Sequence, residues 1–332
     1  MKIGIIGAGS WGTALANLLA GNGAETRLWD LDQELLDDIS QTRENKKYLP
    51  GRYLSESVMI ADELKSCVTD AVFVVTAVPA QHFRSALLAA LPWFKEDAVI
   101  VNVSKGIELL SLLTLSEISE EIAPGFRYAI LSGPSHAEEV MDGLPASVSV
   151  ASKDKKTAEA VQDAFMTERF RVYSQDDVLG VELGGALKNI IALGAGISDG
   201  MGNGDNTKAA IMTRGITEMA RLGEKMGANP ETFYGLSGIG DLVVTCTSVH
   251  SRNRKCGMMI GHGIPPKEAA ARVGMIVEGI PTAEAALGLA KKLGVEMPIT
   301  EAICRVIDGE LPPGEALTNL MTRDKKREHW IR

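Results

Sequence analysis

The sequence predicts an α/β protein in two parts, in which a doubly wound parallel sheet is followed by an all-helical region. Short apolar runs alternate with helical stretches as far as about residue 178, which is typical of a sheet with helices on both faces. Beyond that point strand-like alternation almost disappears and helical runs follow one another. A chain of 332 residues is also long enough for roughly two domains. We therefore expect domains at residues 1–178 and 179–332.

The expected elements follow one another in chain order. Strands are predicted at 2–6, 26–29, 71–78, 98–103, 127–131 and 146–150, with an edge strand at 169–173. Helices are predicted between them at 13–20, 80–91, 111–122, 136–141 and 155–166, and residues 31–65 are polar and helical in pattern, with a loop around 49–51. The second part has helical runs at 179–197, 207–227, 241–248, 252–261, 281–293 and 298–308. The apolar runs of the first half are too short to cross a bilayer, so we expect no membrane span.

Composition and charge argue against several classes of function. The net charge of −9 disfavours non-specific binding to nucleic acid, so a phosphorylated ligand would need a local basic site. The four cysteines contain no C-x-x-C pair, and we expect reduced thiols in a cytoplasmic protein. The first strand begins at residue 2, so no signal peptide is expected before the fold. No metal-binding cluster is visible in the sequence, and no metal is expected.

The strongest motif is the G-x-G-x-x-G of residues 7–12, between the first predicted strand and the first helix. Gly7 suits a tight turn, Gly9 lets a pyrophosphate approach the backbone, and Gly12 allows close packing of helix on strand. The following helix N-terminus offers free N–H groups and the positive end of its dipole. Asp30 ends the second strand, where an acid hydrogen-bonds the adenosine ribose. These features predict a Rossmann-type site for NAD(H) or NADP(H), with NADH favoured because the Asp30 carboxylate would repel a 2′-phosphate.

Two further segments follow predicted strands, at the sheet edge where ligands bind in such folds. Lys105 comes directly after one strand and precedes Gly106, which keeps the backbone open, so we favour a functional lysine over a surface one. Gly133 and Ser135 come after the next strand. Taken alone, these residues favour an ordinary turn with Ser135 as the N-cap of the next helix.

The least ordinary stretch is the helical run around Lys188. Between Glu182 and Asp199, Lys188 is the only charged residue, and Gly184 and Gly185 lie one turn before it. Each glycine costs about 1 kcal/mol inside a helix, so something must require the space. Close helix packing, with the lysine reaching out to solvent, is one interpretation. We favour the other, a desolvated ammonium whose pKa is lowered toward neutrality and which serves in acid–base catalysis.

Two later segments could act together with Lys188. Asp241 follows a glycine-rich turn at the start of a helix, where it is explained by N-capping and could also orient Lys188. Ser251 is predicted to be an N-cap, yet the helix turn behind it carries three cations, which opposes the helix dipole. A bound anion would reconcile the two features, with Arg252 as a fork for phosphate.

Taken together, these segments resemble the bacterial NAD(P)-dependent glycerol-3-phosphate dehydrogenase family. The resemblance covers essentially the whole chain and is carried by residues 7–14, 104–106, 132–135, 184–189, 240–242 and 251–254. The Lys188-Asn189 pair with the later Ser-Arg-Asn-Arg is specific to that family, whereas the dinucleotide motif is widely shared. The resemblance implies a Rossmann domain followed by an all-α domain of the 6-phosphogluconate-dehydrogenase-like kind. It also implies reduction of dihydroxyacetone phosphate to sn-glycerol 3-phosphate for glycerophospholipid synthesis.

The resemblance further implies roles for single residues. Lys188 would be the proton donor and acceptor, with Asp241 as the second catalytic residue. Substrate contacts are implied for Lys105, Gly133, Ser135, Lys188, Asn189, Asp241, Ser251, Arg252 and Asn253. Cofactor contacts are implied for Ser10, Trp11, Lys105, Ala137, Arg252, Ile276 and Glu278, besides Gly7, Gly9, Gly12 and Asp30. The family also implies a cytoplasmic homodimer.

Two alternatives stay open from the sequence. A β-hydroxyacid or 6-phosphogluconate-type dehydrogenase would share the two-domain plan and a Lys-Asn pair, but would act on a carboxylate-bearing substrate. A catalytically inactive NAD-binding sensor would bind NADH without oxidising it in the presence of any ketone phosphate.

Overall fold

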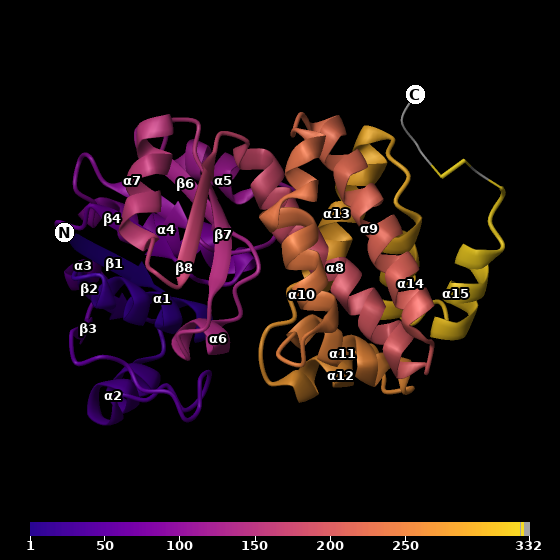
Figure 1. Cartoon of the computed structure of the whole chain (residues 1–332), viewed down its shortest axis with the longest axis horizontal. Helices are drawn as coiled ribbons and strands as arrows, with labels where there is room; N and C mark the ends of the chain where they lie inside the picture. The colour runs from indigo at the N-terminus through magenta and orange to yellow at the C-terminus, as the bar shows by residue number, and fades with distance from the viewer. Residues whose placement is uncertain (326, 329–332) are drawn as a thin grey trace.

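A part that contains the sheet and a part made of helices lie side by side in the computed structural model, which describes residues 1–325 and 327–328 (Figure 1). All strands of the described chain fall within residues 2–175, and helices account for the regular structure from Val178 onward. This arrangement confirms the predicted fold class.

The sheet has eight strands in the order β3-β2-β1-β4-β5-β6-β7-β8. The strands are β1 (Lys2–Ile6), β2 (Glu25–Trp29), β3 (Val58–Ile60), β4 (Phe73–Thr76), β5 (Val99–Asn102), β6 (Arg127–Ser132), β7 (Ala146–Ala151) and β8 (Phe170–Gln175). β1 pairs in parallel with both β2 and β4, so that Ile5 lies opposite Leu28 and Val75. The strand order reverses between β1 and β4, and ligands of open α/β sheets bind at the carboxyl ends of the strands at such a point.

The sheet departs from the prediction at two places. β7 runs antiparallel to β6, and the connection between them contains only the five-residue helix α6 (Ala137–Met141) in place of the full helix that usually joins parallel strands. β3 lies in the segment predicted to be helical, since three residues are too few to show strand periodicity. The predicted edge strand is confirmed as β8, which pairs in parallel with β7.

Helices cover both faces of this sheet. Besides α6, the α-helices of this part are α1 (Ser10–Gly21), α2 (Gln33–Thr42), α3 (Leu64–Val68), α4 (Phe83–Ala90), α5 (Leu115–Ile122) and α7 (Lys155–Phe165). Ile5 belongs to one core cluster with Leu15 of α1, whereas the next residue, Ile6, belongs to another with Val68 of α3. Burial on both faces explains why the strand has a continuous apolar run instead of an alternating one.

The helical part is built around α8 (Val178–Gly200). Around it lie α9 (Asp205–Met226), α10 (Asp241–Thr247), α11 (Arg252–Gly261), α12 (Pro266–Val273), α13 (Gly279–Leu293), α14 (Pro298–Ile307) and α15 (Pro313–Met321), with short turns η3 (Pro230–Tyr234) and η4 (Leu236–Gly240) before α10. The sequence did not predict α12 or α15. α8 is long and apolar enough to cross a membrane, but 94% of its apolar window is buried inside the protein, as in a core helix.

The glycines of α8 allow neighbouring backbone and side chains to come close. A Cβ at Gly184 would lie 2.6 Å from the carbonyl oxygen of Ser237, and one at Gly185 would lie 2.6 Å from Oγ of Ser132. The predicted need for space is therefore real, and it arises from packing against η4 and β6. Lys188 nevertheless does not reach solvent, because only 6% of the residue is exposed.

We expect Gly196→Ala to lower the free energy of unfolding by about 1–3 kcal/mol, because overpacking forces backbone shifts. The added Cβ would lie 2.2 Å from the carbonyl oxygen of Arg254, where α11 crosses α8. Gly21→Ala is the matched control, since a Cβ at this helical glycine meets nothing within 4 Å. Denaturant unfolding should leave Gly21→Ala at least as stable as the parent protein. Equal midpoints for Gly196→Ala and the parent would contradict this account of the helix crossing.

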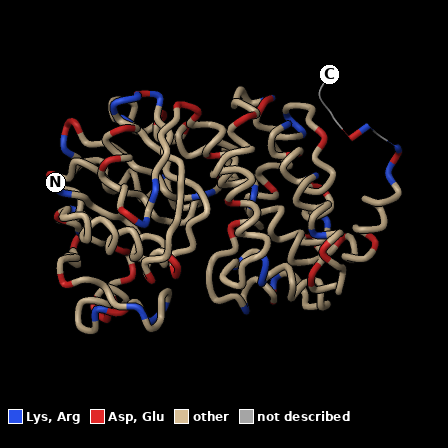
Figure 2. The backbone as a smooth tube through the Cα atoms, in the orientation of Figure 1, with Lys and Arg blue, Asp and Glu red and all other residues tan. Residues whose placement is uncertain are grey.

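Charges are distributed over both parts of the molecule. Lys and Arg alternate with Asp and Glu along the backbone in Figure 2. All four cysteines are free and buried, in keeping with the predicted reduced thiols.

Candidate active site

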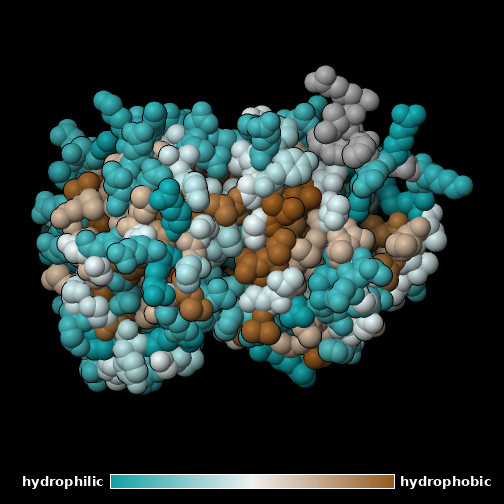
Figure 3. All heavy atoms as spheres, viewed as in Figure 1, coloured by the Kyte–Doolittle hydropathy of each residue, from teal (hydrophilic) through white to brown (hydrophobic). Residues whose placement is uncertain are grey.

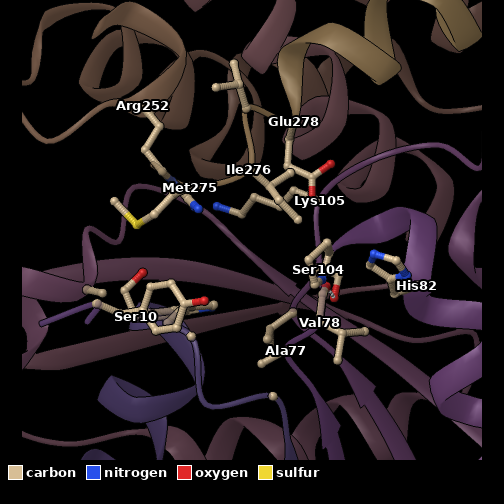
Figure 4. Close-up of a pocket in the computed structure, with 18 of the residues that line it drawn as sticks. Ser10, Ala77, Val78, His82, Ser104, Lys105, Arg252, Met275, Ile276 and Glu278 are labelled. Carbon is tan, nitrogen blue, oxygen red and sulfur yellow. Dashed lines mark hydrogen bonds between the residues drawn. The ribbon is translucent and has the colours of Figure 1, made fainter. Parts of the chain in front are cut away.

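A cavity of about 1240 Å³ lies between the carboxyl edge of the sheet and the helical part. The turns after β1, β4 and β5 form one wall, and α8, α10, α11 and residues 274–281 form the other. Figure 4 shows Ser10, Val78 and Ser104 on the first wall, facing Arg252 and Glu278 on the second. Single-ligand pockets measure about 300–1,000 Å³, so this cavity can hold a dinucleotide together with a small substrate.

The glycine motif has the geometry that was predicted for it. Gly7 has a φ of +108°, and a Cβ there would lie 2.6 Å from the carbonyl oxygen of Ala77. A Cβ at Gly12 would lie 1.9 Å from the carbonyl oxygen of Gly7, so Gly12 serves packing and lies behind the cavity wall. Gly9 lines the cavity and has nothing near it that a Cβ would meet.

The start of α1 fits a pyrophosphate. Within this described helix, no side chain caps the N-terminus and no acid occupies the first turn. Ser10 and Trp11 line the cavity there, as the family resemblance implies. Free backbone N–H groups and the positive end of the helix dipole therefore face the place where the phosphates of a dinucleotide would lie.

Asp30 lines the cavity at the end of β2, as predicted, and also holds the glycine turn. Its Oδ2 accepts the N–H of Ala8 at 2.6 Å, and its Oδ1 accepts the N–H of Asp32 at 3.0 Å. Lys47 lines the cavity nearby, with its Nζ 2.8 Å from Oδ2 of Asp32. This end of the cavity is thus lined by one carboxylate, that of Asp30, and by the Lys47 ammonium group, which is paired with Asp32.

At the opposite end, two lysines share the carboxylate of Asp241. Nζ of Lys188 donates to Oδ1 at 2.6 Å, and Nζ of Lys105 donates to Oδ2 at 2.7 Å. Lys188 also donates to Oγ1 of Thr245 at 2.7 Å, and Lys105 donates to the carbonyl oxygen of Gly133 at 3.2 Å. All of these groups except Gly133 line the cavity.

The electrostatics of this cluster suit proton transfer. Burial lowers the pKa of Lys188 to about 8; attraction to Asp241 opposes this shift, and repulsion from Lys105 adds to it. Burial alone would raise the pKa of Asp241, but the two ammonium groups outweigh it and hold that pKa below its ordinary value. Near neutral pH an anionic Asp241 therefore orients a lysine that can both give and take a proton.

Two predicted N-caps are wrong. Asp241 does not cap α10, because the helix continues directly from η4 and the carboxylate turns instead to the two lysines. Ser135 does not cap α6, which begins at Ala137 with His136 in the N-cap position. The hydroxyl of Ser135 donates to the carbonyl oxygen of Gly133 at 3.0 Å, and Ser135 lines the cavity.

The start of α11 has the local features from which an anion site was predicted. Oγ of Ser251 accepts the N–H of Arg254 at 3.2 Å, which confirms the N-cap. Arg254 itself is bound to Asp199, 2.7 Å away, and does not line the cavity. Arg252 does line it, and Figure 4 shows its guanidinium near the end of Lys105. Of the three cations after Ser251, Arg252 is therefore the one that faces the cavity.

The amides beside Arg252 and Lys188 are joined. Nδ2 of Asn253 donates to Oδ1 of Asn189 at 2.9 Å, and Oδ1 of Asn253 accepts the N–H of Gly279 at 2.9 Å. This chain of bonds connects α8, α11 and α13, and both asparagines line the cavity.

The remaining residues implied by the resemblance lie on the same cavity. Ala137, Ile276 and Glu278 all line it. Oε1 of Glu278 accepts the N–H of Ala80 at 3.2 Å, whereas its buried Oε2 has no hydrogen-bond partner in the part of the chain that the structure describes. That free oxygen leaves Glu278 able to accept a hydrogen bond from a ligand.

Sequence reasoning missed Thr245, which fixes the Lys188 ammonium. The hydroxyl of Thr245 donates to the carbonyl oxygen of Asp241 at 2.6 Å, so its lone pairs are free for Lys188. A threonine inside an apolar helix is unremarkable by itself. Its spacing of one helical turn from Asp241 was the available signal.

A glycine turn for a dinucleotide, opposite a buried lysine–carboxylate cluster and an arginine at a helix start, defines a nicotinamide-dependent dehydrogenase. Family models then narrow the class. The NAD-dependent glycerol-3-phosphate dehydrogenase N-terminus model matches residues 2–158, and the C-terminus model matches residues 177–318. The chain belongs to the NAD-dependent glycerol-3-phosphate dehydrogenase family.

Known proteins similar to the whole chain support this assignment. The glycerol-3-phosphate dehydrogenase (NAD(P)+) of Carboxydothermus hydrogenoformans is 52% identical, over 99% of this chain and 98% of the relative. That of Bacillus subtilis is 50% identical, over 98% and 96%. The crystal structure of glycerol-3-phosphate dehydrogenase from Coxiella burnetii has 38% identity and a TM-score of 0.94, covering 97% of this chain and 99% of the other. A D-mandelate dehydrogenase with 15% identity and a TM-score of 0.62 shares the fold alone.

Proposed function

We propose that the chain catalyses the NAD(P)H-dependent, reversible reduction of dihydroxyacetone phosphate to sn-glycerol 3-phosphate, which supplies glycerophospholipid synthesis. One observation carries the chemical part of this proposal. Lys188, held by Asp241 at 2.6 Å and almost fully buried, lies in the same cavity as the dinucleotide turn.

The proposed reaction needs a proton at the ketone oxygen. A bound reduced nicotinamide supplies the hydride to the ketone carbon. Negative charge then develops on the oxygen, and Lys188 stabilises it and donates a proton from Nζ. Asp241 and Thr245 orient that ammonium by accepting two of its hydrogen bonds. In the reverse direction the neutral amine accepts the proton of the substrate hydroxyl.

The phosphate of the substrate is assigned to the start of α11. Arg252 offers two parallel N–H groups, and the helix N-terminus favours an anion. The further proposed substrate contacts are Lys105, Gly133, Ser135, Asn189, Ser251 and Asn253. Gly133 lies outside the cavity lining, so we assign its contribution to the carbonyl oxygen that holds Lys105.

The assay that tests this function follows the loss of NADH absorbance with different ketones. We expect turnover with dihydroxyacetone phosphate and none with 2-keto acids that carry a carboxylate in place of the phosphate. Turnover with the 2-keto acids alone would favour a β-hydroxyacid-type enzyme. Binding of NADH without turnover of any ketone phosphate would favour a sensor.

For the cofactor, we propose that NADH is preferred to NADPH. A carboxylate about 4 Å from a 2′-phosphate is repelled by roughly 1–4 kcal/mol per unit charge. Asp30→Gly should therefore bring the kcat/KM value with NADPH closer to the kcat/KM value with NADH. The same substitution should also weaken the binding of both cofactors, because the N–H of Ala8 loses its hydrogen-bond acceptor. Asp38→Asn is the control, since Asp38 pairs with Lys46 outside the cavity. Equal or better kcat/KM with NADPH in the parent protein would contradict the preference.

We propose domains at residues 1–178 and 179–332, forming a cytoplasmic homodimer. The domain division is supported by the end of the sheet at Gln175 and by the start of α8 at Val178. Hydrophobic side chains gather on the helical part of the face in Figure 3, and Ile239 and Val243 are both exposed, which supports an interface between copies. The four free cysteines support a reducing compartment.

A further inference from the structure

A loop of residues 43–55, here called the strap, lies over the start of α1. Arg52 forms two hydrogen bonds, of 2.8 and 2.6 Å, with Asp142 beyond α6. The N–H of Ser55 donates to Oδ1 of Asn17 on α1 at 2.8 Å. Leu49 is fully buried in a cluster with Ala14 of α1 and Ala137 of α6. The strap is thus fixed at several points around the glycine turn.

Asn45 is the strap residue that touches the glycine turn itself. It is fully buried, and its Nδ2 donates to the carbonyl oxygen of Ala8 and to Oγ1 of Thr13, both at 2.8 Å. Its Oδ1 accepts the N–H of Tyr48 at 3.1 Å. All the polar atoms of a buried amide side chain are therefore used, which is the condition for such a group to specify one conformation.

Asn45 and Asp30 hold the two peptide groups on either side of Ala8. The carbonyl oxygen of Ala8 accepts a hydrogen bond from Asn45, and the N–H of Ala8 donates one to Asp30 at 2.6 Å. Gly9 comes next and is open to the cavity, so the direction of its N–H depends on how Ala8 is held. We infer that Asn45 is a positioning residue for the dinucleotide, which sets the backbone of the glycine turn where the pyrophosphate binds. This inference rests on the cofactor site of the proposed function and on no assumption about the ketone.

The same side chain also fixes the adjoining wall of the cavity. Lys47 and Tyr48 line the cavity beside Asp30. Since Asn45 binds the N–H of Tyr48, one residue couples the pyrophosphate turn to the wall at the adenosine end. A glycine turn alone has many accessible conformations, and this coupling removes them before a ligand arrives.

The test compares the binding of two probes: ADP-ribose, which contains a pyrophosphate, and adenosine, which contains none. Asn45→Leu keeps the volume and removes all three hydrogen bonds. Thr13→Val removes the hydroxyl that Asn45 binds, together with the 3.3 Å hydrogen bond from that hydroxyl to the carbonyl oxygen of Ala8. We expect the Kd of ADP-ribose to rise about tenfold for Asn45→Leu, which loses two bonds at the glycine turn and one to Tyr48, and to rise less for Thr13→Val. The Kd of adenosine, which has no phosphate, should stay unchanged in Thr13→Val and should rise less than that of ADP-ribose in Asn45→Leu, which also loses the bond to Tyr48.

Asn17→Ala is the matched control, because it removes another hydrogen bond between α1 and the strap, away from the glycine turn. It should leave both Kd values unchanged. An unchanged Kd for ADP-ribose in Thr13→Val and Asn45→Leu would overturn the inference, and so would equal losses for ADP-ribose and adenosine. If Asn45→Leu does not fold, Asn45→Ala decides, because Thr13→Val also removes a hydrogen bond from Thr13 itself to Ala8. The inference and the proposed substrate can fail separately. If the parent protein does not reduce dihydroxyacetone phosphate, yet Asn45→Leu weakens the binding of ADP-ribose, the inference holds and the proposed substrate is refuted.

Discussion

Lys188→Met is expected to yield a folded protein whose kcat for dihydroxyacetone phosphate is lower by at least a factor of ~10²–10⁴, the range for a positioned acid–base group. Methionine keeps the length of the side chain and loses the ammonium that gives the proton and stabilises charge on the ketone oxygen. The Kd of NADH should stay nearly unchanged, because the glycine turn lies on the other part of the molecule. Lys188→Ala should be equally inactive. Steady-state kinetics and fluorescence titration with NADH separate the two effects.

Lys208→Met provides the control for replacing an ion-paired lysine of the helical part. Nζ of Lys208 lies 2.9 Å from Asp199, and Lys208 is outside the cavity lining. Its kcat should remain close to that of the parent protein. If Lys188→Met kept a near-normal kcat, Lys188 would be a structural residue, and Lys105, which shares Asp241, would be the better candidate for the acid.

Arg252→Ala is expected to weaken binding of dihydroxyacetone phosphate by about 2–5 kcal/mol, seen as a rise in KM, because a desolvated phosphate loses its bidentate partner. Arg252→Lys should restore only part of the affinity, since an ammonium group cannot reproduce the planar fork. The measurement is KM for dihydroxyacetone phosphate at saturating NADH.

Neighbouring cations supply the controls for Arg252. Arg254→Ala removes a cation that is already paired with Asp199, and Lys255 is an exposed residue outside the cavity lining. Substituting either should change KM much less. An unchanged KM in Arg252→Ala would place the phosphate elsewhere, with Lys105 as the next candidate.

The features that the sequence predicted best are those in which a local pattern dictates the backbone. The glycine motif required a positive φ at Gly7 and a close approach at Gly12, and both are present. Lys188 stood out because one charge in a long apolar helix has few explanations. Ser251 was identified because a helix start with cations behind it conflicts with the dipole.

The features that could not be predicted depend on contacts between distant parts of the chain. Asn45 acts on Ala8 and Thr13 across more than thirty residues, and nothing in its own segment marks it. Asp241 matched the local preference for N-caps, but its distant partners Lys105 and Lys188 determined where the side chain points. Ser135 matched it too, but its hydroxyl binds Gly133 within the turn itself. The antiparallel direction of β7 likewise depends on how the chain returns through the five-residue helix α6, and the apolar pattern of a strand does not show its direction.

The pH dependence of kcat in both directions tests the role of Lys188 most directly. Burial lowers its pKa to about 8, and reduction of the ketone needs the ammonium form, so kcat for reduction should fall as the pH rises through that value. Oxidation of sn-glycerol 3-phosphate needs the neutral amine, so kcat for oxidation should rise over the same interval. The predicted result is that kcat for reduction falls and kcat for oxidation rises with pH, with the two midpoints near the same pH. Limbs of the same sign in both directions, or opposite limbs that persist in Lys188→Met, would contradict proton transfer by this residue.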